Sequence, residues 1–316
     1  MPADSFASRV LVTGANGFVG AALVRRLQAS GHEVCGVSRS GEAASSGLHC
    51  VRRYEDAAPL MAGQACLVHL AARVHVMNDA EQDPLAAFRA ANVTLAENLA
   101  RQAAAAGVRR FVFISSVKVN GEATLPGQPF NEQHDAAPQD AYGISKMEAE
   151  QGLRQIAAQT GMELVIVRPP LVYGPGVRAN FAALLRAVAR GIPLPLACID
   201  NRRSLVALDN LLDFIVTCIG HPAAANQTFL VSDGEDLSTP ELVRRMARAV
   251  GRPARLIPVP VWLLVAGARL LGKQDQLQRL SGNLQLDISK ARDLLGWQPP
   301  VTVDEGLGRT LADNLP

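Results

Sequence analysis

Short apolar runs alternate with helix-like stretches through the first half of the chain. An alanine-rich stretch at 85–106 is typical of the helices. Strands that alternate with helices form parallel sheets with right-handed crossovers. We therefore expect an α/β fold, a Rossmann doubly wound parallel sheet, with its ligand crevice at the carboxyl ends of the strands. The apolar runs that predict these strands cover residues 10–13, 33–37, 66–70, 110–115 and 164–168.

The second half of the chain has a less regular pattern. Pro193 and Pro195 indicate a loop, and Pro240 suits the first turn of a helix capped by Ser238 or Thr239. This pattern predicts a smaller C-terminal substrate-binding lobe that packs tightly on the sheet. We assign residues 1–178 to the dinucleotide-binding Rossmann domain, with 203–226 returning to it, and residues 179–202 and 227–316 to the lobe.

A late apolar stretch, residues 261–271, contains Trp262 and is interrupted by Arg269. It is too short to span a bilayer, so we expect a packed helix, with a helix lying on a membrane surface as the alternative. The first nine residues have neither a basic start nor an apolar core. We therefore expect no signal peptide, no membrane span and a cytoplasmic location.

Composition and charge exclude several classes of protein. The chain has 316 residues, of which 48% are hydrophobic, enough for a full α/β core. Its net charge of +2 is too small to indicate a nucleic-acid binder. Neither the cysteines nor the six histidines have the spacing of a metal site, so we expect free thiols in a reducing compartment and no metal. The five cysteines are Cys35, Cys50, Cys66, Cys198 and Cys218.

A glycine-rich turn follows the first expected strand and opens a helix. Its spacing is G-x-x-G-x-x-G, with Gly14, Gly17 and Gly20. Glycine permits a tight turn and a close approach of the backbone to a pyrophosphate, and the helix N-terminus supplies N–H donors. We interpret this as a dinucleotide-binding turn; the alternative is an ordinary glycine turn. Its predicted cofactor contacts are Gly14, Asn16, Gly17, Phe18, Val19 and Gly20.

The second expected strand ends in Ser38, Arg39 and Ser40, where an NAD site usually has an acidic residue. A carboxylate would repel a 2′-phosphate, whereas Arg39 could pair with it and the hydroxyls could hydrogen-bond it. Ser38 and Arg39 therefore favour NADP(H) as the cofactor, with NAD(H) as the other possibility. Alternatively, Arg39 is a solvated loop residue or stacks on the adenine.

Tyr142 and Lys146 lie one helical turn apart in the segment AYGISK, downstream of Ser115 and Ser116. Residues i and i+4 share one face of a helix, so both side chains can enter one cleft. A lysine ammonium and an oxidised nicotinamide would lower the pKa of a tyrosine, which could then exchange a hydroxyl proton. Ser116 could hydrogen-bond the same oxygen, and one of the two adjacent serines must point away from the cleft if both lie in a strand. The alternative is that Tyr142 and Lys146 are ordinary residues of a half-exposed helix.

These motifs, in this order, resemble those of an extended short-chain dehydrogenase/reductase of the nucleotide-sugar epimerase/dehydratase family. The resemblance covers nearly the whole chain. It rests on T13-G-A-N-G-F-V-G20, His69-Leu70-Ala71-Ala72, Asn92, Ser115-Ser116, Tyr142 with Lys146, Arg168-Pro169, Tyr173-Gly174-Pro175-Gly176, and D287-ISKARDLLGW297.

The resemblance implies roles for further residues. Leu70, Ala71 and Ala72 would line the adenosine side of the cofactor. Ser115 and Pro169 would also contact the cofactor. Asn92 would brace the backbone of the active site, and Lys146 would also hold the nicotinamide ribose. The substrate-binding residues would be Ser116, Lys118 and Asn120 around the sugar ring, with Asn180 and Arg203 at the diphosphate. Alternatively, Arg203 forms a salt bridge with Asp200 or Asp209.

The position after the active-site serine separates the members of the family. Dehydratases have an Asp-Glu pair there, whereas this chain has Val117 and Lys118, which excludes that elimination. We expect redox chemistry at C4 of a UDP-hexose in bacterial surface-polysaccharide synthesis, and favour a 4-ketoreductase. A C4 epimerase is the alternative, although Asn120 stands where many epimerases have tyrosine. A non-catalytic NADP(H)-binding sensor is a third, more distant alternative. The resemblance also implies a homodimer through 85–106 and 142–160.

Overall fold

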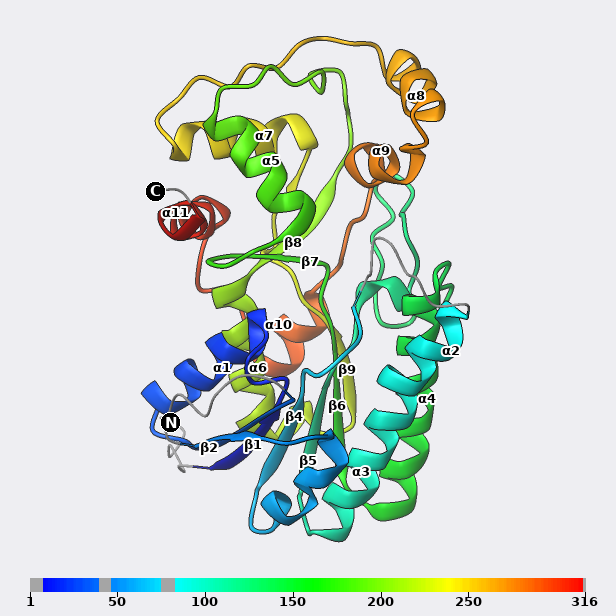
Figure 1. Ribbon diagram of the computed structural model, residues 1–316, viewed down its shortest axis with the longest axis vertical. Coiled ribbons are helices and arrows are strands. Elements are labelled where there is room, and N and C mark those ends of the chain that lie inside the picture. Colours follow the sequence, from blue (N-terminus) through cyan, green and yellow to red (C-terminus); the bar gives the residue numbers. More distant parts are fainter. Residues whose placement is uncertain (1–7, 40–46, 75–82, 315–316) are drawn as a thin grey trace.

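A seven-stranded parallel sheet forms the centre of the computed structural model, which describes residues 8–39, 47–74 and 83–314 (Figure 1). The strand order, β3-β2-β1-β4-β5-β6-β9, confirms the predicted doubly wound Rossmann fold. The first strand in the chain lies near the middle, so the crevice that we predicted lies where the strand order reverses. The strands are β1 (Arg9–Thr13), β2 (Glu33–Ser38), β3 (Leu48–Cys50), β4 (Cys66–His69), β5 (Arg110–Ile114), β6 (Glu163–Arg168) and β9 (Gln227–Leu230).

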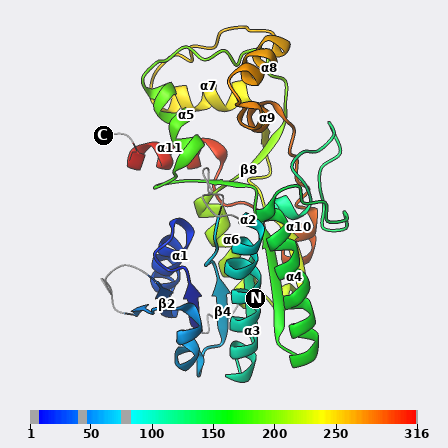
Figure 2. The same ribbon diagram turned by 45° about the vertical axis from the view of Figure 1, so that its right-hand side comes forward.

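Helices cover both faces of this sheet, because alternate residues of each strand point to opposite sides. Val10 and Val12 belong to the core beneath α1 (Phe18–Ala29) and α6 (Leu208–Gly220), whereas Leu11 belongs to the core on the other face. Helices α3 (Leu95–Ala105) and α4 (Ala141–Thr160) pack against each other on that second face (Figures 1 and 2). Both faces of the sheet are buried, which explains why the sequences of the strands are almost wholly apolar.

The helix predicted at 85–106 is interrupted. It consists of α2 (Pro84–Phe88), a π-helical turn η2 (Arg89–Thr94) and α3. Asp83 caps α2 by accepting a hydrogen bond from the backbone N–H of Ala86, at 3.0 Å. A π turn inserts an extra residue and rotates the side chains that follow it. Asn92 lies within this turn and is buried.

A second, three-stranded sheet begins the smaller lobe, which lies at the carboxyl ends of the large sheet's strands. β6 ends at Arg168 and the chain enters the lobe directly, in β7 (Leu171–Tyr173). The order of this sheet is β10-β8-β7, with β8 at Arg203–Ala207 and β10 at Asp236–Leu237. The helices of the lobe are α5 (Ala179–Ala189), α7 (Thr239–Ala249), α8 (Val261–Leu270), α9 (Gln274–Ser281) and α11 (Val303–Asn314).

Some segments of the chain lie in a different part of the fold from the one that we assign them to, the large sheet or the smaller lobe. Strand β9 falls in the range that we assign to the lobe, yet it pairs in parallel with β6 and forms the edge of the large sheet. Helix α10 (Ser289–Leu295) also packs on that side, where Ala291 and Leu295 join the core of α1 and α6. Conversely, β8 pairs with the lobe strands β7 and β10. Pairing between strands that are distant in the sequence decides which sheet each strand joins, and the local sequence pattern does not predict this pairing.

Helix α8 forms where we predicted one, but it packs on one side only and is not enclosed by the lobe. None of its residues is buried, and Trp262 is 69% exposed. Its principal contacts are with α9, a short helix that leaves the outward face uncovered. Over the described ranges, no helix has both the length and the apolar character needed to cross a bilayer.

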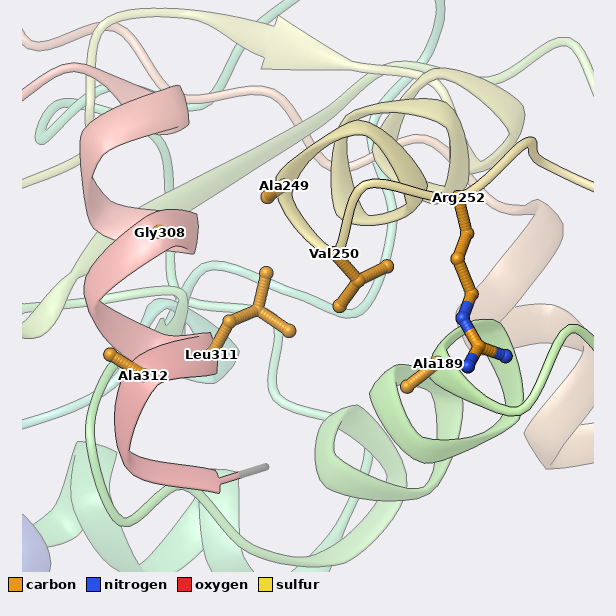
Figure 3. A pocket seen from close by; sticks show the side chains of 7 residues that line it. All are labelled: Ala189, Ala249, Val250, Arg252, Gly308, Leu311 and Ala312. Carbon is orange, nitrogen blue, oxygen red and sulfur yellow. The ribbon is translucent and has the colours of Figure 1, made fainter. Parts of the chain in front are cut away.

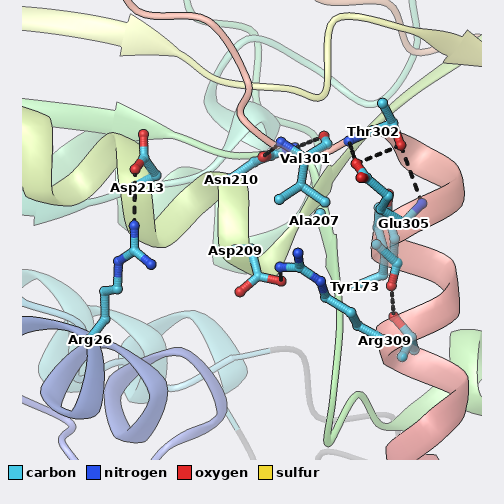
Figure 4. Close-up of polar contacts among 12 residues, drawn as sticks. Arg26, Tyr173, Ala207, Asp209, Asn210, Asp213, Val301, Thr302, Glu305 and Arg309 are labelled. Carbon is cyan, nitrogen blue, oxygen red and sulfur yellow. Dashed lines mark hydrogen bonds and ion pairs between the residues drawn. The ribbon is translucent and has the colours of Figure 1, made fainter. Parts of the chain in front are cut away.

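A buried polar network joins the lobe to the large sheet. The Asn210 amide donates to the Asp233 carboxylate at 2.7 Å and to the Val301 carbonyl at 2.8 Å. The Tyr173 hydroxyl donates to the same carboxylate at 2.8 Å. Figure 4 shows Asn210 and Val301 beside the ion pair of Asp209 with Arg309. Because buried polar groups are costly when they lose their partners, this network fixes how the two bodies meet.

The glycine turn has no room for a side chain at Gly20. A Cβ atom at this position would lie 2.0 Å from the Gly14 carbonyl oxygen. We predict that Gly20→Ala lowers the free energy of unfolding by about 1–3 kcal/mol, because the turn must shift to relieve the overlap. Urea denaturation measures the change.

Gly308→Ala provides the matched control for this substitution. Gly308 lies in α11, and the position that an added methyl group would occupy there is open space. Alanine should therefore leave stability unchanged or raise it. Equal stability of the Gly20→Ala variant and the wild type would contradict the close packing of the turn.

Candidate functional site

The glycine turn joins β1 to α1 in the geometry that a dinucleotide site requires. Gly14 has a φ of +72°, and the Gly17 N–H donates to the Gly14 carbonyl at 2.9 Å. Helix α1 begins at Phe18, so its first N–H groups face the carboxyl edge of the sheet. A Cβ atom at Gly14 would lie 2.8 Å from the backbone nitrogen of Ala71. The cradle is therefore one that only glycine fits, as pyrophosphate binding by backbone N–H groups requires.

The ends of β2 and β4 flank this turn. The Ala15 N–H donates to the Val37 carbonyl at 3.1 Å, which draws the turn against Ser38 and Arg39. Ser38 is buried, whereas Arg39 is exposed and its guanidinium lies 5.4 Å from the centre of the Tyr54 ring. Ser40 lies outside the described residues. That the adenosine ribose of a dinucleotide would lie beside Arg39 stays a prediction.

On the other flank, β4 ends at His69, and Leu70 to Ala72 follow it. The Thr13 hydroxyl bonds to His69 Nδ1 at 2.7 Å and accepts from the Ala71 N–H at 3.4 Å. Burial, assisted by the nearby Lys146 charge, lowers the pKa of His69 to about 3, so its imidazole is neutral. These contacts hold the backbone of Leu70 to Ala72 against the glycine turn.

Asn92 connects that backbone to helix α4. Its side chain accepts from the Arg73 N–H at 2.8 Å and donates to the Arg73 carbonyl at 3.0 Å. It also donates to the Ser145 hydroxyl at 3.0 Å. The π turn aims Asn92 at both partners at once. Asn92 therefore spans the segment after β4 and the helix that carries Tyr142 and Lys146.

The structure brings Ser116, Tyr142 and Lys146 together. Ser116 follows β5, and its hydroxyl is within hydrogen-bonding reach of the Tyr142 phenol. Lys146 is buried, and its ammonium donates to the Ile114 carbonyl at 2.9 Å and lies 6.0 Å from the centre of the Tyr142 ring. Ser115 points the other way, into the protein. The three side chains meet at the carboxyl edge of the sheet, beside the glycine turn.

Burial dominates the electrostatics of Tyr142 and Lys146. Burial raises the pKa of Tyr142 to about 12, assisted by the nearby Asp140 charge and opposed by the Ser116 hydrogen bond. Burial also lowers the pKa of Lys146 to about 7, although the Glu150 charge opposes this shift. Desolvation therefore dominates in the protein alone. The lowering of the tyrosine pKa that we expect from lysine together with an oxidised nicotinamide stays a prediction. Tyr142 is a neutral phenol in this state.

Glu150 is a residue of the site that sequence reasoning missed. Its carboxylate is buried and accepts hydrogen bonds from the Ser115 hydroxyl at 2.6 Å and from Arg168 at 2.6 and 2.9 Å. Arg168 also donates to the Asn120 side chain at 3.0 Å. The signal was present in the sequence, because Tyr142, Lys146 and Glu150 follow one another at four-residue intervals on α4.

Two predicted substrate contacts have protein partners in this structure. Asn120 is buried, and besides accepting from Arg168 it donates to the Asn131 carbonyl at 3.1 Å. Lys118 pairs with Glu122 at 2.8 Å and with Asp140, which caps α4 through the Gly143 N–H. Lys118 thus helps to hold the helix end that carries Tyr142.

The two predicted diphosphate contacts lie in the lobe. Asn180 is exposed at the start of α5, after Ala179, whose φ of +56° is unusual for a residue with a side chain. Arg203 is half-buried and donates to the Gly282 carbonyl at 2.9 Å. Within the described ranges, Arg203 makes no ion pair, and Asp209 pairs with Arg309 instead. The alternative of a salt bridge from Arg203 to Asp200 or Asp209 is therefore wrong.

Two surface grooves lie away from this constellation. One, of about 500 Å³, opens between the ends of α5, α7 and α11, with Leu311 and Val250 pointing into it (Figure 3). The other, of about 360 Å³, lies between α4 and β9. Neither contains a predicted site residue. In the part of the chain that the structure describes, no three His, Cys, Asp or Glu side chains are grouped to hold a metal.

Comparison with known proteins places the chain in a family. The model of the NAD dependent epimerase/dehydratase family matches residues 10–232. A UDP-glucose 4-epimerase of Vibrio cholerae is 48% identical over 307 residues, which cover 95% of this chain and 94% of that protein. A UDP-glucose 4-epimerase of Mycolicibacterium smegmatis is 32% identical over 326 residues, covering 96% and 97%.

A solved structure extends the match to the fold. The UDP-glucuronic acid 4-epimerase of Bacillus cereus, determined in complex with NAD, superposes with a TM-score of 0.78 at 20% identity, over 97% of this chain and 98% of that one. The sequence matches extend through the lobe as well as the sheet. The chain belongs to the NAD-dependent epimerase/dehydratase family, whose members are extended short-chain dehydrogenase/reductase enzymes.

Proposed function

We propose that this enzyme interconverts the C4 epimers of a nucleotide-activated hexose, with a UDP-sugar as its substrate. The observation that carries the proposal is the meeting of Ser116, Tyr142 and Lys146 beside a glycine turn that fits a dinucleotide. The substrate class comes from the two relatives, each named a UDP-glucose 4-epimerase.

The proposed cofactor site follows the carboxyl edge of the sheet. The pyrophosphate would lie on Gly14, Asn16 and Gly17 and on the first turn of α1, formed by Phe18, Val19 and Gly20. Leu70 to Ala72 would line the adenosine, and Pro169 and the backbone of Ser115 would border the nicotinamide side. When bound, the nicotinamide would accept a hydride from C4 and return one to it.

Tyr142 supplies the proton transfer at the sugar's C4 oxygen. In the forward half-reaction its phenolate takes the hydroxyl proton, and in the return half its phenol gives a proton back. Lys146 supplies positive charge that favours the phenolate, and Ser116 hydrogen-bonds the same oxygen. Because burial keeps the Tyr142 pKa near 12 in the free protein, the phenolate requires positive charge that a bound oxidised cofactor would add.

Epimerisation also requires a substrate that is held firmly at one end and can turn at the other. Arg203 supplies a guanidinium whose pKa burial lowers, and Asn180 offers an exposed amide at the start of α5 in the lobe. Together they would grip the diphosphate. Lys118 and Asn120 would border the sugar ring, and their existing protein partners would hold that border in place.

A 4-ketoreductase is the second candidate, and one observation favours it. The end of β2 presents Ser38 and the exposed Arg39, with no acidic residue at the position that would bind the ribose hydroxyls of NAD. This pattern favours NADP(H), which a reductase consumes at each turnover. The family model and the named relatives support NAD and epimerisation instead.

The cellular setting is part of the proposal. The five cysteines are all free thiols, which fits a reducing compartment such as the cytoplasm. A role in surface-polysaccharide synthesis would use the sugar product. A homodimer would form through α3 and α4, which lie side by side on one face of the sheet.

An assay of product and cofactor together separates the two candidates. We expect the purified enzyme to convert UDP-hexoses into their C4 epimers with no net change in nicotinamide absorbance. Tyr142→Phe should reduce kcat by about 10²- to 10⁴-fold, because it removes the acid/base group. Tyr54→Phe, at the adenosine end, is the matched control and should keep kcat. Stoichiometric loss of NADPH with a UDP-4-keto sugar would overturn the epimerase and establish the reductase.

Arg39 tests the cofactor. If NADP is bound, Arg39→Ala should raise the KM for NADP about tenfold or more while the KM for NAD stays constant, because only the 2′-phosphate would lose a charged partner. Arg53→Ala, an exposed arginine paired with Asp56, is the control. Equal effects on the two cofactors would show that Arg39 does not select between them.

Glu150 should set the alkaline limit of activity. Its charge raises the pKa of Lys146, so Glu150→Gln should lower that pKa, and Lys146 would lose its proton at a lower pH. We predict that the alkaline limb of kcat/KM moves to lower pH by about one unit, which corresponds to about 1.4 kcal/mol.

The control for this variant is Glu163→Gln, which removes a carboxylate paired with the buried Arg110 far from the tyrosine. Its profile should match the wild type, and circular dichroism checks that both variants fold. An unmoved alkaline limb in folded Glu150→Gln would exclude the electrostatic role.

A further inference from the structure

Helix α8 presents an apolar face to solvent. Trp262, Ala266 and Leu270 lie at four-residue intervals and share the outward side. Leu270 is 88% exposed, and Leu271, directly after the helix, is 71% exposed. A helix that is apolar all round is normally buried or lies against a membrane. Contiguous exposed apolar side chains therefore indicate a surface that contacts another molecule.

Basic residues precede and follow this face along the chain, and no acidic residue lies within residues 251–274. Residues 251–274 include four arginines and lysines and no aspartate or glutamate, although the whole chain has a net charge of only +2. Arg252 and Arg255 precede the helix, Arg269 lies on it and Lys273 follows it, and all four are exposed. Cationic side chains at the edges of an apolar helix are typical of segments that lie on anionic lipid.

The position of α8 leaves it accessible to a flat surface. Both ribbon views place it at the end of the lobe farthest from the large sheet, with the segment 251–260 running along the same end (Figures 1 and 2). Helices α3 and α4, where we expect the dimer, lie at the other end of the molecule. A membrane could therefore contact α8 while the dimer helices and the sheet stay in water.

We propose that α8 and the segment 251–260 dock this protein onto an anionic membrane surface. Trp262 would lie at the headgroup level with Leu270 and Leu271 inserted beside it, because an indole has an apolar body and a polar N–H. The four basic side chains would contact lipid phosphates. Charge complementarity selects lipid as the occupant, since an apolar protein groove would leave these four cations without partners. The proposal does not rest on the C4 chemistry.

Docking would also orient the substrate lobe. Helix α9 follows α8, and Gly282, the residue after α9, accepts the hydrogen bond from Arg203. The predicted diphosphate contact is thus joined to the membrane-facing helices by a short segment. The diphosphate end of the site would lie nearer to the bilayer than the Rossmann sheet does.

Tryptophan fluorescence tests this docking directly, because the chain has only two tryptophans. Trp297 is buried and donates to Asp213 at 3.0 Å, so a change on adding vesicles reports Trp262. With phosphatidylcholine vesicles that contain phosphatidylglycerol, we expect a blue shift and quenching by brominated acyl chains. With phosphatidylcholine alone, both changes should be weaker. No shift with anionic vesicles would overturn the proposal.

Sedimentation with the same vesicles tests which residues are responsible. The triple variant Trp262→Ser, Leu270→Ser, Leu271→Ser should lower the partition coefficient about tenfold or more, since it removes the inserted side chains. Leu125→Ser, at a leucine that is 65% exposed elsewhere, is the matched control and should bind as the wild type does. Equal loss in both variants would overturn the assignment to α8.

Two further measurements separate lipid from other occupants. Arg269→Gln with Lys273→Gln should weaken binding at low salt and reduce its salt dependence, because these charges contact phosphates. Light scattering of the triple serine variant should give the same mass as the wild type. A fall from dimer to monomer would instead identify a second copy of the chain as the occupant of α8 and contradict the proposal.

Discussion

A buried carboxylate holds the candidate site together. Glu150 lies one helical turn beyond Lys146, and its oxygens bind both Ser115 and Arg168. Burying a charge costs several kcal/mol unless partners satisfy it, and removal of one partner leaves the other exposed to that cost. The end of β5 is therefore tied to α4 by a hydrogen bond from Ser115, and the end of β6 by the ion pair of Arg168 with Glu150. The position of Tyr142 and the charge of Lys146 both depend on this arrangement.

The parallel sheet explains why distant segments supply one site. Since all seven strands run the same way, the residues after β1, β4, β5 and β6 emerge at one edge. The glycine turn, the segment after His69 and Ser116 meet there, and the lobe begins at the same edge after β6. The dinucleotide and the sugar would therefore approach Tyr142 from two different bodies, with the network of Asn210 and Asp233 fixing the angle between them.

Much of this arrangement was predictable because it follows local patterns. The strands of the first half, the glycine turn and the spacing of Tyr142 from Lys146 are each recorded in a few consecutive residues. Strand β9 was not predictable, since four residues become a strand only by pairing with β6. The π turn at Asn92 likewise depends on its contacts with Arg73 and Ser145. The direction of the Tyr142 pKa shift was not predictable either, because it depends on how deeply the fold buries this side chain.

The solvent-facing side of α8 is the other feature that the sequence left open. The same apolar residues predict a packed helix or one on a membrane, and only the structure reveals that no described element covers Trp262 and Leu270. Local hydrophobicity sets how strongly a helix avoids water, whereas the tertiary arrangement sets which partner remains available to it.

In the proposed epimerisation, a hydride leaves C4 of the sugar and returns to it while Tyr142 moves a proton on the oxygen. Turnover of a UDP-hexose deuterated at C4 tests it most directly. We expect the epimeric product to retain the deuterium at C4 and the cofactor to be regenerated unchanged. Loss of the deuterium to water would contradict it, because the carbon-bound hydrogen would then have left as a proton.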